Sequence, residues 1–147
     1  MKVVFDTCVV IYVLQRREPF CTDAMKLVNA VSDQTITGIL TAKSITDIYY
    51  LMRKNLHSEE AARNLLGKLF ILFDVEDTYS VDCHGAIVSP VADYEDAVMV
   101  QTAKRISADC IVTRNQKDYA KSDVPFLSPH ELLGKIITVR PDNETNG

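Results

Sequence analysis

The chain has 147 residues, of which 47% are hydrophobic and 24% charged, values that are ordinary for a single globular domain. Its formal net charge of −4 excludes a protein that binds nucleic acid through bulk positive charge, although a local basic patch is compatible with it. No apolar run reaches the roughly 18 residues of a membrane span, and no secretory signal is visible. We therefore expect a cytoplasmic protein without membrane association.

The four cysteines are scattered and form no C-x-x-C pair; they are Cys8, Cys21, Cys83 and Cys110. Two disulfides would be possible by number. However, Cys8 and Cys110 lie in or beside apolar strand patterns, which favours reduced and buried thiols. This interpretation agrees with a cytoplasmic location.

The first half of the chain alternates strand and helix patterns. Lys2–Phe5 is a short apolar run that predicts a buried strand ending at Asp6, and Thr7 is available as a cap for the following helix. The predicted elements after the first strand are helices over residues 7–15 and 22–32, a strand over residues 35–40, and a helix over residues 42–55.

The second half continues this alternation. The next predicted elements are a helix from residue 58, a strand within residues 70–75, a helix over residues 78–89 and a helix capped by Asp93. A strand over residues 110–113 and an edge strand at residues 125–127 follow, and a capping box at residues 128–131 begins a last helix. We expect one domain over residues 1–136 and a polar tail over residues 137–147. The order of elements predicts an α/β fold with a mainly parallel central sheet of about five strands, covered on both faces.

Acidic residues gather where the carboxyl ends of these strands are expected, which is the edge where open α/β sheets bind ligands. Asp6 follows the first strand, Asp47 lies early in the helix after the second, and Asp118 follows the strand at residues 110–113. Asp93 and Asp96 begin another helix. Each acid alone is typical of a helix cap or turn, but several on one rim repel one another unless a cation neutralises them. An all-oxygen site favours Mg²⁺ or Mn²⁺ over zinc.

Four short segments resemble the PIN-domain family of metal-dependent nucleases. They are V-V-F-D-T at the amino terminus, S-I-T-D-I-Y-Y, D-Y-E-D-A and I-V-T-R-N-Q-K-D-Y. The resemblance implies a three-layer α/β/α fold with a pocket for one or two divalent ions. The catalytic and metal-binding acids that it implies are Asp6, Asp47, Asp96 and Asp118. Asp93 would support them, and Thr113 and Asn115 would be polar groups of the pocket.

The implied reaction is metal-dependent hydrolysis of phosphodiester bonds in single-stranded RNA. Arg114 and Lys117 flank the proposed pocket and would contact the substrate backbone, although a solvated loop is the alternative interpretation. Many PIN domains of this size resemble VapC-like toxins, which are dimeric ribonucleases inhibited by a small antitoxin. The resemblance therefore implies an RNA substrate, an antitoxin partner and a homodimer.

Two positions depart from the family pattern. Cys8 stands where the family usually has Asn, and Asp47 stands where it usually has Glu, which is one methylene longer. Mg²⁺ tolerates little change in geometry, so a PIN-like module that binds RNA or a protein partner without cutting is the main alternative. A haloacid-dehalogenase-type phosphatase would need an Asp at the position of Cys8. The absence of Walker, GxGxxG, GxSxG and HExxH motifs argues against the corresponding enzymes.

Overall fold

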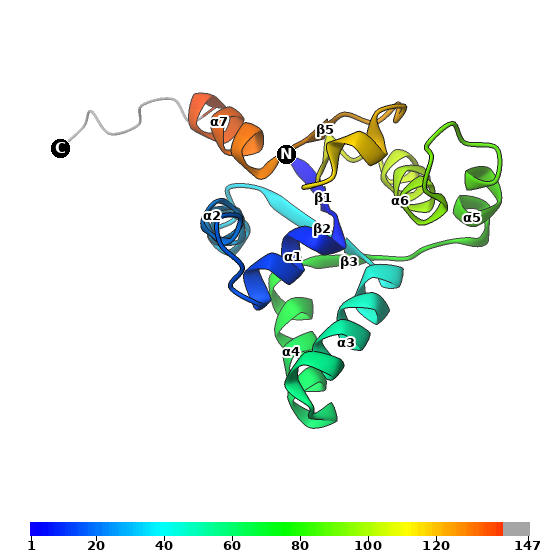
Figure 1. Cartoon of the computed structure of the whole chain (residues 1–147). Coiled ribbons are helices and arrows are strands. Elements are labelled where there is room, and N and C mark those ends of the chain that lie inside the picture. Colours follow the sequence, from blue (N-terminus) through cyan, green and yellow to red (C-terminus); the bar gives the residue numbers. More distant parts are fainter. Residues whose placement is uncertain (140–147) are drawn as a thin grey trace.

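The computed structural model describes residues 1–139, and these residues form a five-stranded parallel sheet flanked by helices (Figure 1). The strands are β1 (Lys2–Phe5), β2 (Thr37–Thr41), β3 (Asp74–Glu76), β4 (Cys110–Val112) and β5 (Phe126–Leu127). Their order across the sheet is β3-β2-β1-β4-β5, and every neighbouring pair is parallel. The predicted α/β class and the parallel sheet of about five strands are confirmed.

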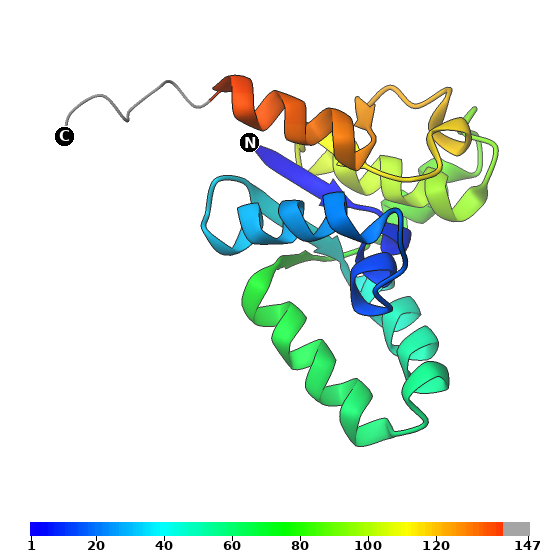
Figure 2. The same ribbon diagram turned by 60° about the vertical axis from the view of Figure 1, so that its left-hand side comes forward.

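Helices cover both faces of the sheet, so the fold has three layers (Figures 1 and 2). The helices are α1 (Thr7–Leu14), α2 (Cys21–Ser32), α3 (Ala42–Leu56), α4 (Glu59–Leu72), α5 (Ser80–Ala86), α6 (Tyr94–Arg105), the 3-10 helix η1 (Gln116–Tyr119) and α7 (Pro129–Val139). Successive side chains of a strand point to opposite faces. Val3 and Phe5 accordingly pack in a core with α1, α2 and α7, whereas Val4 packs with α5 and α6. The sheet is thus enclosed by two separate hydrophobic clusters.

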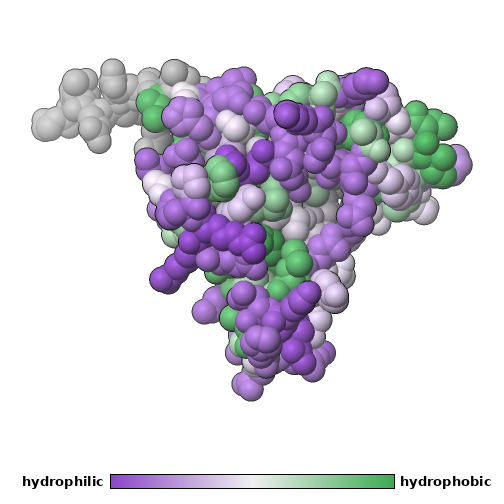
Figure 3. All heavy atoms as spheres, viewed as in Figure 1, coloured by the Kyte–Doolittle hydropathy of each residue, from purple (hydrophilic) through white to green (hydrophobic). Residues whose placement is uncertain are grey.

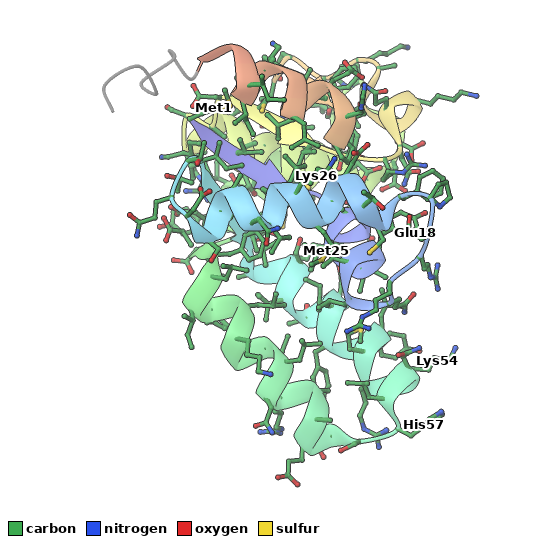
Figure 4. The ribbon with its side chains drawn as sticks, turned by 90° about the vertical axis from the view of Figure 1, so that its left-hand side faces the viewer. Met1, Glu18, Met25, Lys26, Lys54 and His57 are labelled. Carbon is green, nitrogen blue, oxygen red and sulfur yellow. The ribbon has the colours of Figure 1, made fainter. Side chains whose placement is uncertain are left out.

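Helices α3 and α4 form an antiparallel pair that projects away from the sheet (Figures 1 and 2). The Thr41 hydroxyl caps α3 by accepting from the Ser44 N–H at 3.1 Å, and Ser58 caps α4 in the same way. Between the two helices His57 adopts a left-handed conformation with φ 53°, which ends α3. Figure 4 shows Lys54 and His57 at this outer end of the pair, far from the sheet.

A buried ion pair attaches α5 to α6. Asp82 on α5 is only 2% exposed, and it accepts hydrogen bonds from the Thr102 hydroxyl at 3.0 Å and from the Tyr79 N–H at 2.9 Å. The Arg105 guanidinium donates to the same carboxylate at 3.0 Å, and this charge, with the hydrogen bonds, holds the pKa of Asp82 below its usual value despite burial. The buried carboxylate of Asp82 is therefore fully paired.

Some predicted elements differ in the structure. The strand predicted within residues 70–75 is Asp74–Glu76, at the end of this window and one residue beyond it, because Phe70 to Leu72 complete α4. The apolar run there follows helical spacing, with Leu69 and Phe73 buried and Ile71 88% exposed. Thr7 is the first residue of α1 and not its cap.

The expected boundary between domain and tail stays a prediction. Helix α7 continues to Val139, so the expected domain boundary at residue 136 falls inside it, and the rest of the predicted tail lies outside the described residues. None of the helices in residues 1–139 has the length and hydrophobicity needed to cross a membrane. All four cysteines lie within the described part and are free thiols.

Candidate active site

Asp6 stands at the centre of the sheet edge, where β1 ends between β2 and β4. Its N–H donates to the Val112 carbonyl at 2.9 Å, which extends the β1–β4 ladder by one residue and fixes the backbone. Its carboxylate, in a residue only 7% exposed, accepts from the Thr113 hydroxyl at 2.8 Å and lies 3.2 Å from the Tyr119 hydroxyl. Because the chain reverses direction across the sheet at β1, this position is the topological switch point of the fold.

Asp96 faces Asp6 from the first turn of α6. Asp93 caps this helix by accepting from the Asp96 N–H at 3.0 Å, so the predicted cap is confirmed. The Tyr119 hydroxyl lies 3.1 Å from the Asp96 carboxylate and has one proton for the two acids. Burial, followed by the charges of Asp6, Asp93 and Asp118, raises the pKa of Asp96 to about 6. The carboxylates therefore repel one another at this point.

Asp47 lies on α3 and is paired with a lysine. The Lys43 ammonium is 2.6 Å from the Asp47 carboxylate, one helical turn away, and 3.5 Å from Glu95 on α6. Burial lowers the pKa of Lys43, but the hydrogen bond and charge of Asp47 and the charge of Glu95 more than offset this, and the pKa is raised. Lys43 thus connects α3 to α6 as a permanent cation.

A cavity of about 440 Å³ opens between these elements, and three of the four predicted acids line it. They are Asp6, Asp47 and Asp96. Asp118 is exposed on η1 and does not line the cavity, although its charge contributes to the raised pKa of Asp96. The charged side chains that complete the wall are Glu95, Lys43 and Arg17. Acidic and basic groups therefore share one cavity.

The residues predicted to contact substrate lie in different surroundings. Thr113 is buried against Asp6, and its hydroxyl also accepts from the Asn115 N–H at 3.0 Å. Arg114 turns its guanidinium onto the ring of Phe20, 3.1 Å from the ring centroid, and Lys117 is exposed on η1. Neither basic side chain lines the cavity. Within the described residues, the basic groups of the cavity wall come instead from α3 and from the segment after α1.

Comparison with known proteins agrees with this arrangement. A family model described as PIN domain matches residues 2–117, which is most of the chain. The chain belongs to the PIN-domain family. No curated protein matches it significantly.

Solved structures share the fold of this PIN domain at low sequence identity. VapBC2 from Rickettsia felis, bound to a DNA fragment from its promoter, has a chain with a TM-score of 0.66 and 12% identity, over 87% of our chain and 98% of its own. A toxin–antitoxin complex from Klebsiella pneumoniae has a chain with a TM-score of 0.65 and 19% identity, over 88% of our chain and 98% of its own. DNA-bound VapBC from Salmonella typhimurium has a chain with a TM-score of 0.64 and 14% identity, over 88% of our chain and 98% of its own. These similarities establish the three-layer PIN fold.

Cys8 and Asp47, the two positions expected from the sequence to depart from the family pattern, both lie on the cavity wall. Burial, followed by the charge of Asp6, raises the pKa of the Cys8 thiol to about 12, so this side chain is neutral at physiological pH. It therefore adds no charge beside Asp6. The short side chain of Asp47 is directed to Lys43, and the two groups form an ion pair at 2.6 Å on the cavity wall.

Sequence reasoning missed two residues of the site. Tyr119 is fully buried and its hydroxyl contacts both Asp6 and Asp96, although the sequence shows only that it follows Asp118. Lys43 is four residues before Asp47, and this helical spacing is a signal from which the ion pair was predictable.

The donor set of this PIN domain fits a hard divalent ion in its chemistry. Carboxylate oxygens of Asp6, Asp96 and Asp47 border one cavity, and the mutual repulsion around Asp96 is the kind that a bound cation relieves. Within residues 1–139, no three Asp, Glu, His or Cys side chains are grouped closely enough to hold an ion as they stand. Asp47 would have to leave Lys43 to join the other two acids.

Proposed function

We propose that this PIN domain is an endoribonuclease that hydrolyses phosphodiester bonds of single-stranded RNA and depends on Mg²⁺ or Mn²⁺. The observation that supports it most is the convergence of Asp6, Asp47 and Asp96 on one cavity at the switch point of a parallel sheet. PIN domains generally use divalent metal ions, and these three acids are the proposed ligands. Asp118 is proposed as a fourth acid that acts through its charge.

The residues of the chain have distinct parts in this proposal. A divalent ion held by the three acids would activate a water molecule and stabilise charge on the phosphate. Thr113 and Tyr119 hold the Asp6 carboxylate in one orientation, and Asp93 fixes the start of the helix that carries Asp96. Arg114, Asn115 and Lys117 remain proposed as groups near the path of the substrate.

Lys43 gives the cavity a cation that is always present. Its side chain is 32% exposed and its ammonium is held by Asp47 and Glu95, so it can turn toward an entering phosphate with little loss of solvation. If Lys43 moves to the RNA backbone, Asp47 is released at the moment when substrate arrives. We infer that substrate binding and completion of the set of acids are coupled through this lysine.

The biological role that we propose is the toxin of a toxin–antitoxin pair. One solved structure with this fold is a toxin–antitoxin complex, and others are VapBC assemblies bound to DNA. We accordingly propose a small antitoxin as a protein partner, a homodimer as the assembly and the cytoplasm as the place of action. Strongly exposed apolar side chains such as Ile71 (88%) and Val88 (85%) provide surface for such contacts. Figure 3 shows hydrophobic side chains at the edge of the molecule near the segment that follows α5.

The test is cleavage of mixed-sequence single-stranded RNA by the full chain with Mn²⁺, with Mg²⁺ and with EDTA. Asp96→Asn should reduce cleavage by at least a hundredfold, because it removes a ligand at the most crowded point of the site. Asp123→Asn is the matched control, since Asp123 pairs with Lys104 on the surface at 2.6 Å and changes the same charge. Equal cleavage by wild type and Asp96→Asn would disprove the assignment.

A second function is supported by one specific observation. Lys43 neutralises Asp47, and no preformed ion-binding group exists in the described part of the chain. This observation favours a domain that binds RNA or a protein partner without cutting. Titration with Mn²⁺ beside the cleavage assay separates the two functions. Asp47→Glu should restore the usual reach of the carboxylate, and cleavage by this variant but not by wild type would show that the natural chain does not cut, as the binding function requires.

A further inference from the structure

The cavity has a second end that the acids do not occupy. Beyond Asp6 and Asp47 it is lined by Ile11 and Tyr12 of α1, by Arg17, and by Tyr50 and Leu51 of α3. We call these five residues the aromatic end. Figure 3 shows hydrophobic side chains exposed where the α3–α4 pair leaves the body of the molecule. Acidic and aromatic ends therefore belong to one continuous cavity.

Helix geometry explains how both ends come from the same two helices. On α3 the spacing of Lys43, Asp47, Tyr50 and Leu51 places them on one face, because residues three and four apart are neighbours. Tyr50 then lies about 5 Å beyond Asp47 along the α3 axis. The Thr7 hydroxyl donates to the Ser44 hydroxyl at 3.0 Å and fixes α1 against α3 at the acidic end. The aromatic end is thus about one nucleotide away from the acids.

The fold itself does not use two of the side chains at this end. Tyr50 is 67% exposed, and Arg17 is also exposed. Within residues 1–139, neither side chain forms a hydrogen bond, an ion pair or a ring contact. Tyr12, by contrast, packs on Phe20 with ring centroids 5.2 Å apart, so one aromatic wall is fixed and the other is free. A flat ligand can therefore enter against Tyr50 without breaking a structural contact.

The chemistry of the aromatic end matches a nucleobase with its phosphate. Aromatic rings stack on every base, and positively charged side chains of the same groove hold the backbone. Arg17 and Lys43 line the same cavity as Tyr50, so two cations are available to the backbone of a ligand in a chain whose net charge is −4. Bases of duplex RNA are stacked on one another and cannot reach such a platform.

We propose that the aromatic end is a base-stacking subsite, in which Tyr50 stacks on the base next to the scissile phosphate and Arg17 contacts the following phosphate. This inference rests on the proposed function for its substrate and extends it to a specific residue. Such a subsite would select unpaired RNA, because only a nucleotide turned out of a helix can place its base on Tyr50 while its phosphate lies at the acids.

The test measures binding separately from cleavage. A short single-stranded RNA that contains 2-aminopurine is titrated with the full chain carrying Asp96→Asn, in EDTA, and both affinity and fluorescence quenching are recorded. Adding Tyr50→Leu should weaken binding about tenfold and remove the quenching, whereas Tyr50→Phe should keep both, because the ring and not the hydroxyl is needed. Phe70→Leu is the control, since Phe70 is an exposed aromatic on α4, 55% exposed, outside the cavity.

Each outcome decides the inference separately from the proposed function. Unchanged affinity and quenching in Tyr50→Leu overturn it, even if wild type cuts RNA with metal, and would leave the aromatic end to a segment of a protein partner. An equal loss in Tyr50→Phe or in Phe70→Leu also overturns it. If wild type does not cut RNA but quenching depends on Tyr50, the nuclease proposal fails and the subsite stands.

Discussion

Replacement of Asp96 by asparagine should stabilise the metal-free protein at alkaline pH. The pKa of Asp96 is raised from its ordinary 3.8 to about 6, first by burial and then by the charges of Asp6, Asp93 and Asp118. A rise of about two units corresponds to about 3 kcal/mol for the ionised side chain. Because the side chain is only partly buried, solvent screening reduces this to about 1.5 kcal/mol.

The pH dependence gives the sign of the effect. A raised pKa means that the folded protein holds this proton more tightly than the unfolded chain does. Below about pH 4 the carboxyl group is protonated in both states, so wild type and Asp96→Asn should have the same free energy of unfolding. Between about pH 4 and 6 the unfolded chain has released this proton while the folded protein still holds it, so wild type loses stability across this window and the loss is complete above pH 6. The Asn side chain stays neutral and can still accept from Tyr119.

The assay is thermal or urea unfolding in EDTA at pH 4 and pH 8. At pH 8 the variant should be more stable by about 1.5 kcal/mol, or about 5 °C in Tm for a domain of this size. Asp123→Asn is the control, because Lys104 lowers the pKa of Asp123 and the variant should gain nothing. Equal stability of Asp96→Asn and wild type at pH 8 would refute the idea that these acids repel one another.

Three further changes test separate parts of the structure. Lys43→Met should raise Mn²⁺ affinity about threefold to fivefold in a calorimetric titration, because it frees Asp47 from a pair at 2.6 Å; weaker binding would mean that Lys43 positions this acid. Asp82→Ala should lower the free energy of unfolding in urea by about 2–3 kcal/mol, because Arg105 loses its buried partner, and a loss well below 1 kcal/mol would contradict this. Gly67→Ala should raise the free energy of unfolding by about 0.8 kcal/mol, because a Cβ at this position of α4 meets nothing within 4 Å.

The sequence predicts the acidic edge because its causes are local. Asp6 follows an apolar run, Asp93 has the chemistry of a helix cap, and parallel strands bring their carboxyl ends to one edge. The start of β3 was not predictable, since a short apolar run such as residues 69–73 is consistent with a strand and with the last turn of a helix. Local pattern alone does not distinguish the two.

The contacts that complete the site depend on side-chain directions that no local pattern contains. Tyr119 reaches Asp6 across 113 residues of sequence, and Arg114 stacks on Phe20 although a charge after a strand suggests exposure. The aromatic end was missed for the same reason. In the sequence Tyr50 is one more residue of an amphipathic helix, and its place on the cavity wall follows only from the packing of α1 against α3.

The central position of β1 has a consequence for how the protein is made. Asp6 is synthesised before its hydroxyl partners Thr113 and Tyr119, which follow it by 107 and 113 residues. At about 5–20 residues per second, a ribosome needs roughly 5–20 seconds to travel from one to the other. Throughout that time the growing chain contains Asp6 without the groups that orient it. The Asp6 carboxylate can therefore be fixed in place only after all but the last of the four strands that follow β1 in the sequence have been made.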